Sequence, residues 1–236
     1  MPHQSPAARS QSHQDLFGGT AGWDVKYWTS SDDRVRGGKS QSYLECPRDS
    51  QDERSAAAVF RGDLDIKTLG GAGFASQRTT DDLSWDLSSM DGILLRLGKS
   101  DGKKYTFTLK DESLPKRPDG REQSTVSWEY DFAGKDGNDL FVPWTDFKPT
   151  YRGKPKSDAD PLDLKNVKRL SIMMRSFFGE QEGSFRLEIK SISAAKQSTH
   201  DLKRLATESS AAYPEKAPYK APKPTWKDWV CGVLWR

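Results

Sequence analysis

The sequence predicts an all-β protein with the architecture of a sandwich or a barrel. Apolar residues alternate with polar residues at five places along the chain, which is the period of a strand with one buried face. Clusters of Gly, Asp, Asn and Ser separate these segments, and few windows have the spacing of an amphipathic helix. Many short strands joined by such turns favour a sandwich or a barrel over the other fold classes.

The alternating segments define the strands in chain order. Residues 93–97 and 105–109 flank the turn-forming sequence Lys99-Ser100-Asp101-Gly102, so we predict that these two strands form a hairpin. Three further strands are predicted at residues 126–132, 170–174 and 185–189. The apolar positions of the five strands are Ile93, Leu95, Leu97, Tyr105, Phe107, Leu109, Val126, Trp128, Tyr130, Phe132, Leu170, Ile172, Met174, Phe185, Leu187 and Ile189.

Three places interrupt this pattern. Residues 47–58 are polar and are predicted to form a loop. Residues 114–123 contain Pro115 and Pro118, which also favours a loop. Pro143 lacks the N–H that an inner strand donates, so it indicates an edge strand or a bend.

The composition places the chain among polar proteins that still build a core. Of its 236 residues 34% are hydrophobic and 30% are charged, with a formal net charge of +3. The mean hydropathy is −0.83 and the sequence pI is about 8.7. Eight Trp indicate packed cores, and the near balance of charge disfavours a nucleic-acid-binding protein, which usually carries a concentrated basic stripe.

Cysteine and histidine are too sparse to indicate a metal site or a catalytic centre. Cys46 and Cys231 lie far apart in sequence, so no zinc-type spacing occurs. Of three His, only His200 lies outside the N-terminal tail, and no G-x-S-x-G nucleophile sequence is present. We therefore predict no catalytic residue, no metal and no cofactor, and we expect a reducing compartment.

The chain divides into three zones. Residues 1–14 are predicted to be a disordered polar tail that lacks the apolar stretch of a secretory signal. Residues 15–195 carry the strand pattern, and no window is long and apolar enough to span a bilayer. Residues 196–236 form a Pro-, Lys- and Trp-rich tail that we expect to be largely irregular. This tail has three open roles, which are docking on the sandwich, binding a partner, and peripheral contact with a membrane surface.

The charged segment 28–42 is the principal candidate for a binding site. Opposite charges lead into Gly37-Gly38, where the backbone can turn tightly, so several charged side chains gather at one bend. Two interpretations remain open. The charges either pair to fix the turn, which contributes little stability when they are exposed, or form a recognition surface on a rigid scaffold.

Other local patterns have mainly structural interpretations. Gly38-Lys39-Ser40 resembles the end of a phosphate-binding loop, but Asp33 stands where that motif needs its first glycine. Residues 70–73 are glycine-rich and predict a turn or bulge. The carboxylates at positions 63, 65, 81 and 82 are candidate calcium ligands, and the other interpretation is that they are ordinary solvated side chains. Around Arg152, aromatic residues indicate either core packing or an aromatic–basic patch.

Six segments in order resemble the complex I intermediate-associated protein 30 family over about residues 16–193. They begin with Trp28 and Asp33-Arg34-Val35-Arg36-Gly37-Gly38-Lys39-Ser40. The others are Phe60-Arg61-Gly62-Asp63-Leu64, Gly70-Gly71-Ala72-Gly73-Phe74-Ala75-Ser76-Gln77-Arg78, Asp91 to Tyr105, Phe141 to Gly153, and Gly183 to Ile189. The resemblance implies a jelly-roll β-sandwich similar to galactose-binding domains.

The resemblance also implies a function. It suggests a non-enzymatic, chaperone-like assembly factor in mitochondria that binds intermediates of respiratory complex I (NADH:ubiquinone oxidoreductase). Its partners would be proteins rather than nucleic acids. The candidate partner-binding residues are Asp32, Asp33, Arg34, Arg36, Lys39, Gln41, Arg78 and Arg152. One alternative is a carbohydrate-binding module, which the implied fold and the 11% aromatic content suggest. Another is a cytosolic scaffold, since the N-terminus lacks a clear mitochondrial presequence.

Overall fold

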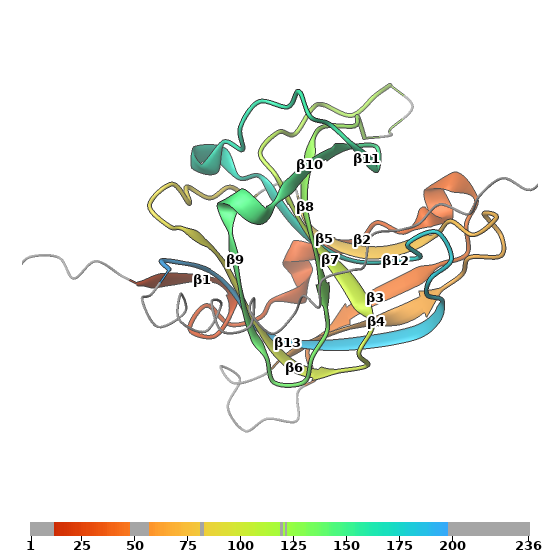
Figure 1. The fold of residues 1–236 in the computed structure, drawn as a ribbon, viewed down its shortest axis with the longest axis horizontal. Helices are drawn as coiled ribbons and strands as arrows, with labels where there is room; N and C mark the ends of the chain where they lie inside the picture. The colour runs from red at the N-terminus through yellow and green to blue at the C-terminus, as the bar shows by residue number, and fades with distance from the viewer. Residues whose placement is uncertain (1–11, 48–56, 81–82, 119, 121, 198–236) are drawn as a thin grey trace, which may run out of the picture. The chain divides into compact units, whose positions relative to one another are not determined.

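Two antiparallel sheets form a sandwich, which confirms the predicted all-β fold class (Figure 1). The computed structural model of the chain describes residues 12–47, 57–80, 83–118, 120 and 122–197. The predicted tails at residues 1–11 and 198–236 lie outside the described residues, as does most of the predicted loop at 47–58. The first strand begins at His13, so residues 13 and 14 of the predicted tail belong to the sheet.

Sheet A is built around one long central strand. Its order is β3-β4-β13-β6-β9, and β1 also pairs with β13. One edge of β13 pairs with β4 in its first half and with β1 in its second half, while the other edge pairs with β6. The strands are β1 (His13–Gly18), β3 (Gln41–Glu45), β4 (Ala58–Leu64), β6 (Gly92–Ser100), β9 (Asp139–Pro143) and β13 (Gly183–Ala195).

Sheet B faces sheet A across the core and has the order β11-β10-β8-β7-β12-β5-β2. Its strands are β2 (Trp28–Ser30), β5 (Phe74–Thr79), β7 (Lys104–Lys110), β8 (Ser127–Ala133), β10 (Lys148–Tyr151), β11 (Lys154–Pro155) and β12 (Arg169–Arg175). Short 3-10 helices lie between strands at η1 (Val25–Tyr27), η2 (Asp33–Arg36), η4 (Trp144–Asp146) and η5 (Leu164–Asn166).

The predicted alternation places its apolar residues in the core. On β7, Tyr105, Phe107 and Leu109 have no exposed surface, and the apolar positions of β6 and β12 are buried equally. Removing each such side chain from water contributes about 1.5–3 kcal/mol. Adjacent polar positions such as Lys104 and Arg169 lie on the outer faces.

The hairpin predicted across residues 99–102 is wrong. β6 belongs to sheet A and β7 to sheet B, so the two consecutive strands do not pair. Instead, the Asp101 amide donates to the carbonyl of Arg186 on β13 at 3.2 Å, and the Arg186 amide donates to the Asp101 carboxylate at 2.9 Å. The turn sequence correctly marks a reversal of the chain, but a local signal does not specify which strands pair after it.

Candidate partner-binding surface

The charged bend lies between β2 and β3 and contains η2. The 3-10 helix ends at Gly37, whose φ of 83° is left-handed, and the amides of Gly37 and Gly38 donate to the carbonyls of Arg34 and Asp33 at 3.1 Å each. Glycine adopts this backbone without the steric cost of a Cβ atom. The chain therefore reverses over a few residues, as the double glycine predicts.

Asp33 lies at the centre of the bend and is completely buried. Its Oδ1 accepts from the Ser40 amide at 3.0 Å, and its Oδ2 accepts from the Ser40 hydroxyl at 2.7 Å and from the Phe74 amide at 3.1 Å. A buried carboxylate is stable only when its oxygens are satisfied in this way. Asp33 thereby ties η2 both to the start of β3 and to the start of β5.

Asp32 makes a second connection of the same kind. Its Oδ1 accepts from the Ser42 hydroxyl at 2.6 Å and from the Ser76 amide at 2.9 Å, and its Oδ2 accepts from the Ser42 amide at 3.2 Å. Ser42 is on β3 of sheet A, whereas Ser76 is on β5 of sheet B. Gln77 adds a bond from its side-chain amide to the Ser42 carbonyl at 3.0 Å. The two carboxylates therefore connect the two sheets at the bend.

The structure thus corrects the role of two predicted partner-binding residues. Asp32 and Asp33 are 3% and 0% exposed, so a partner cannot touch them directly. The sequence shows charged residues at a turn, but it does not show that Ser40, Ser42 and the amides of β5 surround the carboxylates. Their role in the structure is to hold the bend.

The cations of the bend face solvent. Arg34 contacts Asp32 only at 3.4 Å, and 52% of its side chain is exposed. Arg36 lies over the Phe74 ring at 5.4 Å, and Lys39 and Gln41 are exposed. The buried acids therefore leave a basic surface, which we call the basic bend and define as Arg34, Arg36, Lys39 and Gln41.

Arg78 and Arg152 do not belong to the basic bend. Arg78 forms an ion pair with Glu122, which also binds Arg169 at 2.8 Å, and Arg152 donates to the Ser124 hydroxyl at 3.2 Å. Both arginines therefore contact the segment that precedes β8. The sequence alone does not identify Glu122 as the partner of Arg78, because nothing in a Pro-containing loop indicates which strand it covers.

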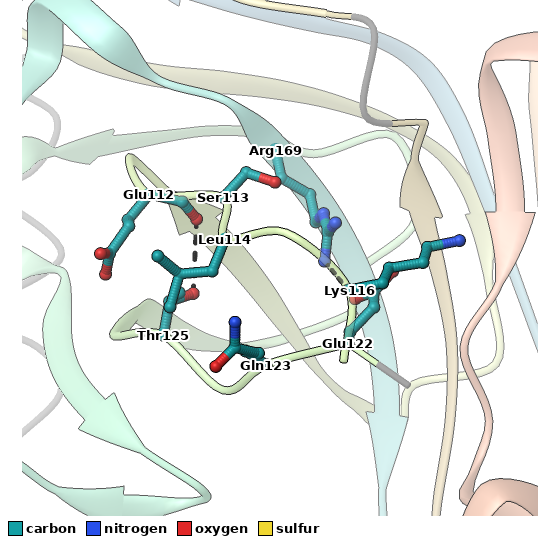
Figure 2. A pocket seen from close by; sticks show the side chains of 8 residues that line it. All are labelled: Glu112, Ser113, Leu114, Lys116, Glu122, Gln123, Thr125 and Arg169. Carbon is teal, nitrogen blue, oxygen red and sulfur yellow. Dashed lines mark hydrogen bonds and ion pairs between the residues drawn. The ribbon is translucent and has the colours of Figure 1, made fainter. Parts of the chain in front are cut away.

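The segment that precedes β8 forms one wall of a small polar hollow (Figure 2). The hollow is lined by Glu112, Ser113, Leu114, Lys116, Glu122, Gln123, Thr125 and Arg169. Beside it, Lys110 donates to the Thr125 hydroxyl at 2.9 Å. Burial lowers the pKa of Lys110, and the neighbouring Arg169 guanidinium acts in the same direction. Figure 2 shows Arg169 directed at Glu122, so the arginine that lines the hollow is already paired with a carboxylate of the same chain.

The charges on the outer face of sheet B also neutralise one another. Arg175 binds Glu129 at 2.9 Å and both carboxylate oxygens of Asp131 at 2.6 Å. Thr106 donates to Asp131 at 2.6 Å, and Thr150 donates to Glu129 at 2.7 Å. The basic bend differs from this face, because its cations are not committed to strong internal pairs.

The described residues contain neither a metal-ligand cluster nor a membrane-spanning helix. Over residues 12–197 apart from the gaps given above, no group of three His, Cys, Asp or Glu side chains is placed to hold a metal ion. Within the same part of the chain, no helix has the length and apolar character required to cross a membrane.

The fold and the comparisons define the class of protein. The sandwich matches the family 11 carbohydrate-binding module of a Clostridium thermocellum cellulase with a TM-score of 0.54 at 15% identity, covering 80% of this chain and 98% of the module. A solution structure of the same module, CtCBM11, matches with a TM-score of 0.53 at 14% identity, covering 81% and 99%. These likenesses establish a jelly-roll, galactose-binding-like sandwich and concern the fold alone.

Sequence comparison then establishes the family. Residues 16–189 match the complex I intermediate-associated protein 30 (CIA30) family. A Schizosaccharomyces pombe protein described as uncharacterized protein C9E9.15 is 44% identical over 183 residues, covering 76% of this chain and 82% of the relative. The chain belongs to the CIA30 family, which confirms the resemblance found in the sequence.

Proposed function

We propose that this protein is a non-enzymatic, chaperone-like factor that binds intermediates of mitochondrial complex I during their assembly. The observation that carries the proposal is the match of residues 16–189 to the CIA30 family. Both this family and the sandwich modules of similar fold are of non-catalytic kinds. The protein would hold an intermediate and shield it from aggregation until the next subunit binds.

The basic bend is the surface we propose for partner contact. Its backbone is held by two buried carboxylates that bond to both sheets, so the cations are presented on a rigid support. A preorganised loop loses less conformational entropy when it binds. Arginine and lysine at such a position favour a partner surface that carries carboxylates.

A carbohydrate-binding role receives less support from the described side chains. Sugar sites need exposed aromatic faces, but many aromatic residues of the described segments, including Trp28, Trp128 and Phe107, are buried in the core. The exposed aromatic residues of the described segments lie on four separate elements. They are Tyr27 of η1, Tyr43 of β3, Tyr151 of β10 and Phe178 in the turn after β12. They do not form one platform.

The experiment is localisation of the full-length chain in its native cell, followed by blue-native electrophoresis of the mitochondrial fraction. We expect a mitochondrial protein that migrates with subcomplexes of complex I, and we expect assembly to stall when the gene is deleted. Exclusively cytosolic protein, or normal complex I assembly after deletion, would contradict the proposal.

Charge reversal tests whether the basic bend makes the contact. Replacing Arg34, Arg36 and Lys39 with Glu should release the protein from the subcomplexes. The matched control reverses the exposed Lys135, Lys148 and Lys190, which changes the net charge equally on other parts of the sandwich. If both triple variants lose binding alike, the contact depends on overall charge and not on the bend.

A further inference from the structure

The turn that follows β12 carries a fully exposed aromatic side chain. Phe178 is 97% exposed, more than any other large hydrophobic residue in the described segments, and Val35 of η2 follows at 79%. A phenyl ring in water gains nothing from folding, so stability does not explain its position. A single exposed apolar side chain is common on protein surfaces, whereas several gathered in one place mark a contact surface.

The backbone of this turn makes phenylalanine a costly residue. Phe177 and Phe178 have φ of 46° and 60°, and Gly179 follows at 91°. The left-handed region suits glycine and asparagine, whereas for bulky residues it is an outlier. Strain of this kind is concentrated at functional positions, where a side chain is kept despite its conformational cost.

The turn is nevertheless firmly held. The amides of Gly179, Glu180 and Gln181 all donate to the Ser176 carbonyl, at 3.1, 2.9 and 3.3 Å. The Gln181 side-chain amide donates to the carbonyls of Lys104 and Arg175 at 2.8 and 2.7 Å. Phe178 is therefore presented by a fixed turn.

The preceding ring has a different position. The Arg175 guanidinium lies over the Phe177 ring at 4.7 Å, and the Lys104 ammonium lies over it at 5.5 Å. Cation–π contacts of this kind keep an aromatic ring on the protein surface. Of the two neighbouring rings, only Phe178 projects freely.

The turn lies at the same end of the sandwich as η2 (Figure 1). The Ser176 amide donates to the Gly73 carbonyl at 3.0 Å, which connects the turn to the residue before β5. Phe74, the first residue of β5, donates its amide to Asp33, and its ring lies beneath Arg36. This end therefore presents two apolar side chains from separate loops together with the exposed cations of η2. We call this set the apolar tip and define it as Val35 and Phe178 together with Arg34 and Arg36 of η2 and Lys39, which follows η2.

We propose that the apolar tip inserts into the surface of an anionic lipid bilayer. Projecting apolar side chains can insert between lipid headgroups, which adapt to their shape. A groove on a protein would have to match the shape of these side chains. Cations beside them are attracted to the negative lipid surface. Two acids lie near the tip: Glu180 is paired with Lys104 at 2.9 Å, whereas Asp65 accepts from the Thr68 amide at 3.0 Å and keeps its negative charge. This inference goes beyond the proposed function and does not depend on it.

The experiment is vesicle co-sedimentation of the full-length protein. Vesicles of phosphatidylcholine alone are compared with vesicles in which phosphatidylserine replaces about a quarter of the lipid. We expect binding to the anionic vesicles that weakens as salt is raised. Phe178→Asn should weaken partitioning about tenfold, since the ring no longer enters the apolar layer.

Asparagine is chosen because it tolerates the left-handed backbone, so the variant should fold. Leu114→Asn is the control, because Leu114 is a 40% exposed apolar residue that lines the hollow beside β8. It should bind vesicles as the wild type does. Equal binding by wild type and Phe178→Asn, or no binding of the wild type to anionic vesicles, would overturn the proposal.

Blue-native migration of Phe178→Asn separates this proposal from the previous one. If the variant loses vesicle binding but still migrates with complex I subcomplexes, the Phe178 ring contacts lipid and is not needed for the client contact. If it leaves the subcomplexes while wild-type vesicle binding is absent, the tip binds a protein and the membrane proposal is wrong.

Discussion

The carboxylate of Asp33 occupies the space into which any side chain at position 38 would project. A Cβ atom built on Gly38 would lie 2.3 Å from the Asp33 Cγ, closer than two such atoms can approach. The glycine is therefore required by the buried acid, and the acid in turn bonds to Ser40 and to Phe74 on β5. The double glycine therefore allows a tight turn and also leaves room for the buried Asp33 carboxylate that connects the bend to β5.

The first prediction concerns Gly38→Ala. The new methyl group should displace the Asp33 carboxylate from its donors, and we expect the free energy of unfolding to fall by about 2–3 kcal/mol. Urea denaturation measures the change. Gly37→Ala is the control, because its φ of 83° is strained for alanine but its Cβ would meet nothing within 4 Å. It should cost about 1–2 kcal/mol, and an equal loss for both variants would show that the acid is not responsible.

The second prediction concerns Asp32→Asn, which keeps the shape of the side chain but replaces one acceptor oxygen with a donor. Asp32 accepts from donors on β3 and β5, so an amide must face at least one N–H or O–H group. We expect a loss of about 1–3 kcal/mol of stability in urea denaturation. Asp160→Asn, at an exposed position, should change stability by less than about 0.5 kcal/mol. A similarly small effect at Asp32 would mean that its bonds contribute little.

The third prediction concerns pH and the attachment of β1. Partial burial acts to raise the pKa of Asp15, but hydrogen bonds from Ser193 and Thr20 outweigh it and leave the pKa below its ordinary value. A carboxyl whose pKa is lower in the folded state stabilises the fold above its unfolded-state pKa, and this contribution is lost as pH falls through the folded-state value. Acid should therefore weaken the attachment of β1 to β13.

Comparison of the wild type with Asp15→Asn measures this contribution. The difference between their urea midpoints should be larger at neutral pH than in acid below the ordinary pKa of an aspartate, because the lowered pKa of the folded Asp15 carboxyl places the loss there. The exposed Asp160→Asn variant gives the baseline. A difference that stays constant across this range would show that the ionised form of Asp15 is not what stabilises β1.

The sequence predicted the strands better than their partners. Side-chain alternation on β6, β7 and β12 reflects burial of one face, which is a local property and is visible in sequence. The pairing of β6 with β13 instead of β7 is set by contacts across the whole chain. Only the family resemblance specified a jelly roll in advance.

The same distinction applies to the site. The charged bend was found because its residues are contiguous, and Arg34, Arg36 and Lys39 are indeed exposed there. The burial of Asp32 depends on Ser76, which is distant in sequence, so no local pattern reveals it. The sequence does not indicate that Phe178 is exposed, because an aromatic residue that follows an alternating strand is expected to be buried.

The fourth prediction follows from the backbone at Phe178. Because the side chain is 97% exposed, removing it sacrifices almost no buried surface, and asparagine is better suited to a φ of 60°. Phe178→Asn should therefore keep the wild-type stability or exceed it by up to about 1 kcal/mol in urea denaturation. Phe177→Asn has a similar backbone but loses the contacts of its ring with Arg175 and Lys104, so it should gain less or lose stability. A clear loss for Phe178→Asn would mean that the ring is stabilised within the folded protein, which would remove the reason to assign it a contact role.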